Sequence, residues 1–173
     1  MIIANYIVSN SDIDQVWMVV SPHNPHKKKK SLAKDRDRLH LVRLAIGDNL
    51  NIKASDIEFD LPQPSYTIDT LTFISEKYPD KDFSLIMGGD NLATLHKWKN
   101  YESIINNYQI LVYKRPSYEL GELKDHNNVM VCDAPLLQIS ASYIRKCIKE
   151  KKSVQYLVSD SVYEYLEVTP IYK

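Results

Sequence analysis

The stretch FSLIMGGD, residues 83–90, joins a short apolar run to two glycines and an aspartate. A continuous apolar run of this length is typical of a strand buried on both faces, as the strands of a parallel sheet are. The next stretch, NLATLHKWKNYESIINN at 91–107, reads as a helix. A buried strand that passes directly into a helix is the building unit of a parallel α/β sheet, so this stretch decides the fold class.

Helices and apolar strands alternate along the rest of the chain. The patterns predict strands at 16–20, 52–59, 108–116 and 129–133, and helices at 2–9, 35–49, 67–79, from Ser142, and at 160–167 with Asp160 as its cap. This order predicts an α/β fold, a Rossmann-like doubly wound parallel sheet in one domain over residues 1–173. Such sheets bind ligands at the carboxyl ends of their strands, so polar residues that follow strands form the candidate site.

Composition excludes several classes of function. Lys and Arg together number 22, as do Asp and Glu, so no global field would hold a nucleic acid or an acidic membrane surface. No apolar run approaches the ~20 residues of a membrane span. The two cysteines, Cys132 and Cys147, are too few for a disulfide framework, which favours a reducing cytoplasm. We therefore expect a cytoplasmic protein whose anionic ligand is small and locally held.

The stretch LLQISASYIRKCIKE, residues 136–150, predicts a phosphate site. Ser140 and Ser142 stand where a helix begins, and Arg145 falls in its predicted first turn. A helix N-terminus carries about half a positive charge, so a guanidinium there is unfavourable unless an anion lies between the two. Free N–H groups, hydroxyls and an arginine that converge on one point are typical of phosphate binding.

The stretch QPSYTIDTL, residues 63–71, predicts a second anion site. Pro64 forbids a helix before Ser65, and the hydroxyls of Ser65, Tyr66 and Thr67 are available as caps for the helix that follows. The free N–H groups of that helix would receive a carboxylate. Taken alone, the stretch is equally well an ordinary helix cap.

The stretch MGGDNLATLHKW, residues 87–98, predicts a nucleotide contact. Gly88 and Gly89 let a ligand approach the backbone at a strand end, and Asp90 would accept from ribose hydroxyls. Trp98 would stack on a flat ring, although a tryptophan at helical spacing is more often part of the core. In PHNPHKKKK, residues 22–30, Lys27 would face a phosphate or be part of a solvated basic loop, and a zinc pair from His23 and His26 lacks a third ligand.

Together, SPHNPHK, PSYTIDTL, MGGDNLATLHKW, VYKRP and ISASYIR resemble, in order and rough spacing, the motifs of bacterial nicotinate-nucleotide adenylyltransferases. The resemblance covers nearly the whole chain. ISASYIR is similar to the Ser-x-x-x-x-Arg signature of the nucleotidylyltransferase superfamily, which holds the ATP triphosphate. It implies ATP-phosphate contacts for Ser140, Ser142 and Arg145.

The resemblance also implies roles for residues elsewhere in the chain. It implies Asp90 and Gly88 for ATP, Lys27 as a second phosphate-binding and catalytic cation beside Arg145, Tyr66 and Thr67 for the nicotinate carboxylate, Trp98 for the pyridine ring, and the backbone N–H of Lys99 as a second carboxylate donor. The implied reaction is attack of the nicotinate mononucleotide phosphate on the α-phosphorus of ATP, with Mg²⁺ as the metal. The products are deamido-NAD and pyrophosphate, and no protein nucleophile is required.

One part of the family pattern has no counterpart. The resemblance implies a first strand and a His-x-Gly-His turn before the opening helix, and the chain as numbered begins with that helix. We expect that strand to belong between 16–20 and 83–90, and adenylyl transfer to be impaired without it. Two alternatives remain open: a pantetheine-phosphate adenylyltransferase, with a similar signature, and a truncated non-catalytic nucleotide-binding module. The sequence also leaves open the oligomeric state, a homodimer included, and the preference for the acid over the amide mononucleotide.

Overall fold

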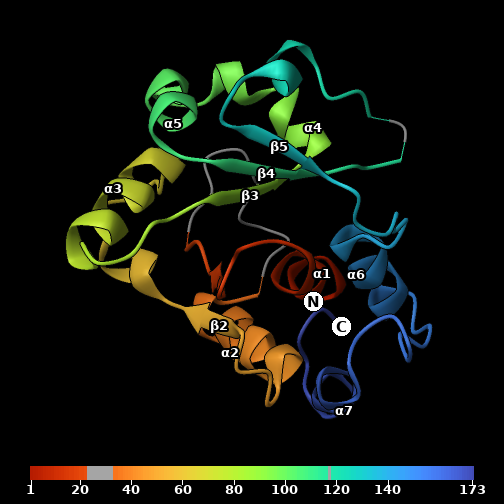
Figure 1. The fold of residues 1–173 in the computed structure, drawn as a ribbon. Coiled ribbons are helices and arrows are strands. Elements are labelled where there is room, and N and C mark those ends of the chain that lie inside the picture. Colours follow the sequence, from red (N-terminus) through yellow and green to blue (C-terminus); the bar gives the residue numbers. More distant parts are fainter. Residues whose placement is uncertain (23–32, 117) are drawn as a thin grey trace. The chain divides into compact units, whose positions relative to one another are not determined.

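The computed structural model describes residues 1–22, 33–116 and 118–173. It has the predicted alternation of helices and strands (Figure 1). The helices are α1 (Ile2–Asn10), α2 (Asp35–Ile46), α3 (Thr67–Lys77), α4 (Gly89–Leu92), α5 (Tyr101–Asn107), α6 (Ala141–Lys149) and α7 (Asp160–Val168), with 3₁₀ turns η2 (Ile57–Asp60), η3 (Leu95–Lys97) and η4 (Glu122–Asp125). The strands are β1 (Val16–Val19), β2 (Ile52–Ser55), β3 (Leu85–Gly88), β4 (Ile110–Tyr113) and β5 (Val129–Cys132).

Contacts within the chain divide it into two compact units. Unit 1 comprises Ile3–Pro64 and Ile139–Lys173, and unit 2 comprises Ser65–Gln138. The predicted phosphate-binding residues of the α6 region therefore belong to unit 1. The residues predicted for the ribose and the pyridine ring belong to unit 2.

All strand pairs in the described residues are parallel, as the sequence predicts. In unit 1, β1 pairs with β2, with Val16 opposite Ile52. In unit 2 the strand order is β3-β4-β5, with Leu85 opposite Ile110 and Ile110 opposite Val129. Strand hydrogen bonds in the described residues therefore form two sheets, one in each unit.

The core of unit 1 includes a cluster of C-terminal residues. Cys147 and Ile148 of α6 are buried with Val162 and Leu166 of α7. Leu41 and Leu44 of α2 pack against this cluster. The apolar residues that the sequence places at helical spacing in α2 and α6 thus meet in one core, which fixes the direction of α6 within unit 1.

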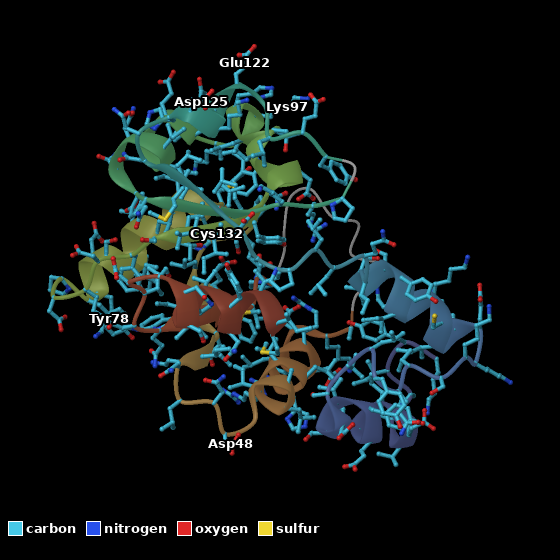
Figure 2. The ribbon with its side chains drawn as sticks, turned by 45° about the vertical axis from the view of Figure 1, so that its right-hand side comes forward. Asp48, Tyr78, Lys97, Glu122, Asp125 and Cys132 are labelled. Atoms are coloured by element: carbon cyan, nitrogen blue, oxygen red, sulfur yellow. The ribbon has the colours of Figure 1, made fainter. Side chains whose placement is uncertain are left out.

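The core of unit 2 is centred on β4. Ile110, Leu111 and Val112 are at most 1% exposed, because β4 has a paired strand on each side. The neighbouring β5 is an edge strand, and its Met130 and Val131 are exposed. α3 and α5 lie side by side (Figure 1). Figure 2 shows the side chains of Lys97, Glu122 and Asp125 directed outward, in agreement with their exposure.

The single helix predicted over 91–107 is wrong. The chain forms α4 and η3, passes through an extended Trp98, and begins α5 after Asn100, whose φ is 50°. The Thr94 hydroxyl donates to the carbonyls of Asp90 and Asn91, both at 3.2 Å, which competes with continuation of the helix. Asparagine tolerates the left-handed conformation that reorients the chain before α5. Trp98 therefore lies in a turn and not on a helical face.

Several predicted boundaries also differ from the structure, and the helix predicted over 35–49, for example, ends at Ile46. The strand predicted over 52–59 ends at Ser55, and a 3₁₀ turn follows. The strand predicted over 108–116 is limited to Ile110–Tyr113. Ser159, not Asp160, occupies the N-cap position of α7.

Among the helices of the described residues, none has the length and apolar character needed to cross a bilayer.

Candidate functional site

The start of α6 is set by Ser140. Its hydroxyl oxygen accepts a hydrogen bond from the Tyr143 N–H at 3.2 Å, which is the usual N-cap arrangement. The helix consequently begins at Ala141, one residue before the predicted Ser142. Arg145 is then the fifth helical residue and lies in the second turn, so the prediction that it lies in the first turn is wrong.

Arg145 and Ser142 nevertheless lie on the same face of α6. The Arg145 Nη2 donates to Ser142 Oγ at 3.2 Å, and the guanidinium lies 5.9 Å from the centre of the Tyr172 ring. Ser142 is exposed and Arg145 is half-buried. Within the described residues, no carboxylate lies at ion-pair distance from Arg145. Its positive charge is therefore available to an anion from solution.

Asp90 has one carboxylate oxygen without a partner. Its Oδ2 lies 3.4 Å from Nη1 of Arg115, whereas Oδ1 is buried and has no hydrogen-bond partner in the described part of the chain. Arg115 Nη2 also donates to the Tyr113 hydroxyl at 3.3 Å. An unpaired buried acceptor is costly, so Oδ1 is a favourable place for a hydroxyl donor from a ligand.

Arg115 belongs to this candidate cluster, and the sequence analysis did not single it out. It follows the carboxyl end of β4 in VYKRP, and that position after a strand was the available signal. Burial lowers the pKa of the Arg115 guanidinium, but its hydrogen bond with Tyr113 and the nearby charges, including that of Asp90, outweigh burial and raise the pKa overall. Arg115 therefore stays protonated and presents its positive charge to the Asp90 carboxylate.

Gly88 is required by the packing of this cluster. A Cβ on Gly88 would collide with Asp90 Oδ1 and would lie 3.0 Å from Nε of Arg115 and 3.2 Å from Cζ of Tyr113. The space above its backbone is thus filled by side chains of unit 2. The structure thus gives a second reason for glycine at this position, namely room for the Asp90–Arg115 pair, and its expected role toward a ligand stays a prediction.

The first turn of α3 has unpaired backbone donors. Tyr66 is the N-cap residue, and no side chain caps the helix, so the predicted role of the nearby hydroxyls as caps is wrong. The first helical bond is donated by the Thr70 N–H to the Tyr66 carbonyl at 3.2 Å. The N–H groups of 67–69 precede it and bind no acceptor among the described residues. They can receive an anion.

Lys99 is joined to this helix start by its side chain. The Lys99 Nζ lies 2.9 and 3.0 Å from the two carboxylate oxygens of Asp69 and 4.6 Å from the centre of the Tyr66 ring. The Lys99 backbone N–H has no acceptor in the part of the chain that the structure describes. Trp98, which precedes it, is half-buried. The Lys99 side chain therefore contacts the start of α3, where the resemblance implies that Tyr66 and Thr67 bind a carboxylate, while the role of the Lys99 backbone N–H stays a prediction.

Lys27 lies outside the described residues, as do His23 and His26. On either side of that segment, Arg38 donates to the carbonyls of Ser21 at 2.7 Å and Ala33 at 3.3 Å. Arg38 thus connects the described residues on the two sides of the segment that contains Lys27.

In the part of the chain that the structure describes, no group of three His, Cys, Asp or Glu side chains is placed to hold a metal ion.

Comparison with protein families gives a match over most of the chain. The model of the cytidylyltransferase-like family matches residues 2–147. Among curated proteins, the chain is 54% identical to the probable nicotinate-nucleotide adenylyltransferase of Flavobacterium johnsoniae, over 100% of this chain and 91% of that protein. It is 51% identical to the protein of the same name from Cytophaga hutchinsonii, over 96% and 86%. A more distant relative of that name, from Bacillus licheniformis, is 30% identical over 100% and 90%.

Solved structures show the same fold. The chain is similar to Plasmodium falciparum nicotinic acid mononucleotide adenylyltransferase complexed with NaAD, with a TM-score of 0.78 and 18% identity over 98% of this chain and 88% of that one. The same enzyme complexed with APC gives a TM-score of 0.74 at 17% identity, with the same coverage. At these identities the likeness supports the Rossmann-like α/β fold that the sequence predicts.

Proposed function

The chain belongs to the cytidylyltransferase-like family and, within the curated proteins, to the nicotinate-nucleotide adenylyltransferases, and from that premise we propose how its residues perform adenylyl transfer. A phosphate oxygen of nicotinate mononucleotide attacks the α-phosphorus of ATP. The new O–P bond forms as the bond from the α-phosphorus to the bridging oxygen breaks. Pyrophosphate leaves, and deamido-NAD, an intermediate of NAD biosynthesis, is the product.

The observation that carries the choice of acceptor is the start of α3. The N–H groups of its first turn are unpaired among the described residues, and the Lys99 side chain is joined to this turn by the Asp69–Lys99 ion pair of 2.9 Å. Unpaired backbone donors at a helix start suit a carboxylate, because each of its two oxygens can accept a hydrogen bond from a separate N–H group. We assign the nicotinate carboxylate to this place, with Thr67 and Tyr66 at the helix start and Trp98 stacked on the pyridine ring.

The ATP phosphates are assigned to the start of α6. Ser140, Ser142 and Arg145 supply a capped helix terminus, a hydroxyl and a guanidinium without a carboxylate partner among the described residues. A triphosphate supplies the negative charge that would balance the Arg145 guanidinium and the positive end of the helix dipole. The ribose of ATP is assigned to Asp90, whose Oδ1 is unpaired, with Gly88 leaving room for that carboxylate.

Catalysis in this proposal is positioning and charge stabilisation. The attacking phosphate is already a nucleophile, so no protein nucleophile is required. Arg145 would neutralise the charge that develops on the departing pyrophosphate, and Lys27 is proposed as a second cation. Mg²⁺ enters with ATP as part of the substrate and neutralises phosphate charge when bound. A reaction that consumes ATP suits the cytoplasm, and we include that location in the proposal.

A substrate screen tests this function. The protein is incubated with ATP and either nicotinate mononucleotide, nicotinamide mononucleotide or phosphopantetheine, and the products are identified by mass. We expect pyrophosphate release and deamido-NAD with the first acceptor. Faster transfer to phosphopantetheine would assign the chain to the alternative adenylyltransferase. ATP binding without transfer to any acceptor would identify a nucleotide-binding module instead.

A further inference from the structure

Asp69 places a negative charge at the helix start where a substrate carboxylate is proposed to bind. It is the third residue of α3, and no side chain caps this helix. A carboxylate in a first turn interacts favourably with the helix dipole, and a second carboxylate at the same terminus is repelled by the first. A site for nicotinate at this position therefore needs a means of offsetting Asp69.

The Lys99 ammonium provides that offset. Nζ contacts both oxygens of Asp69 and also lies over the ring of Tyr66, the N-cap residue. The two side chains are 43% and 46% exposed, and ion pairs so exposed contribute little to stability. The pair is therefore poorly explained as a device that stabilises the fold. Its position beside the unpaired N–H groups is better explained by an effect on a bound anion.

We propose that the Asp69–Lys99 pair determines the preference for the acid over the amide mononucleotide. Lys99 keeps the first turn of α3 electrically balanced, so the helix N–H groups attract a carboxylate without repulsion from Asp69. This inference rests on the proposed function and adds two side chains to it. Lys99 acts through its side-chain charge, separately from the role proposed for its backbone N–H.

The two partners should have opposite effects on substrate preference. In Lys99→Met, Asp69 is left unbalanced, so we expect the KM for nicotinate mononucleotide to rise about three- to tenfold. The KM for nicotinamide mononucleotide, whose carboxamide is uncharged, and the KM for ATP should each change by less than about twofold in the same variant, because neither interaction depends on a carboxylate at this helix start. In Asp69→Asn the negative charge is removed, so the KM for nicotinate mononucleotide should stay level or fall.

The experiment measures steady-state kinetics with both mononucleotides for the wild type, Lys99→Met, Asp69→Asn and the double variant. Lys97→Met is the matched control, because Lys97 is an exposed lysine of unit 2 whose side chain points outward (Figure 2). We expect the double variant to recover most of the nicotinate preference that Lys99→Met loses. Melting temperatures report whether any variant loses its fold.

Three outcomes would overturn the inference. If both single variants lose nicotinate affinity equally and the double variant does not recover, the pair only holds the shape of unit 2. If Lys99→Met leaves the acid-to-amide ratio unchanged, Lys99 has no role in selectivity. If the wild type neither binds nor uses nicotinate mononucleotide, the proposed function fails first and this inference fails with it.

Discussion

Arg145 and Ser142 form one donor pair on α6, with the Arg145 Nη2 donating to Ser142 Oγ at 3.2 Å. The two residues are three positions apart along the helix, so both side chains face the same way. Ser140 uses its own hydroxyl to cap the helix, which leaves Ser142 and Arg145 as the side chains most available to phosphate.

Arg145→Ala should weaken ATP binding strongly. Loss of a charge-assisted contact costs roughly 1.5–3 kcal/mol, or about one to two decades in affinity. Calorimetric titration with ATP measures the change. Lys149→Ala, an exposed cation on the same helix, is the control for loss of one positive charge. Equal losses in the two variants would indicate general charge attraction, and unchanged affinity in folded Arg145→Ala would refute the assignment.

Trp98→Ala should weaken the binding of nicotinate mononucleotide and leave ATP binding nearly unchanged. Stacking of an aromatic side chain on a base is worth about 1–3 kcal/mol, and we expect a similar effect on the pyridine ring. Binding of each substrate is measured separately, with the melting temperature as a control. A loss of stability without substrate selectivity would show instead that the half-buried indole packs only within the fold.

Gly88→Ala should lower both stability and ATP affinity. The added Cβ would displace Asp90, Arg115 or Tyr113, and overpacking of this kind costs about 1–3 kcal/mol. Gly47→Ala is the comparison, because Gly47 has a φ of 60° but no atom near the added Cβ. That substitution should cost stability alone. Equal ATP affinity in the two variants would separate Asp90 from the ATP site.

Ser65→Ala should leave the free energy of unfolding unchanged or raise it. Ser65 is 8% exposed, and its Oγ has no hydrogen-bond partner among the described residues. Removal of an unsatisfied buried hydroxyl relieves its desolvation cost, which is about 1–3 kcal/mol. Urea denaturation measures the change. A clear loss of stability would mean that the hydroxyl has a partner, for example a buried water.

Much of the fold could be predicted from local patterns. The apolar runs of β1, β3, β4 and β5 and the spacing in α2 and α3 are properties of neighbouring residues, and the structure confirms them. The helix predicted over 91–107 failed because apolar spacing does not report a Thr94 hydroxyl bonded to the backbone or an Asn100 in the left-handed region. The start of α6 was misplaced by one residue because either serine could have been the cap.

For the candidate site, the sequence likewise predicts which residues stand at each place but not which of them contact one another. The sequence by itself determined that an arginine and two serines stand at one helix start, that Tyr66 and Thr67 stand at another, and that an aspartate follows a strand. Only the tertiary structure decided that Lys99 pairs with Asp69, thirty positions away, and that Arg115 pairs with Asp90. The physical reason is that backbone conformation depends mainly on nearby residues, whereas an ion pair depends on the packing that brings distant segments together.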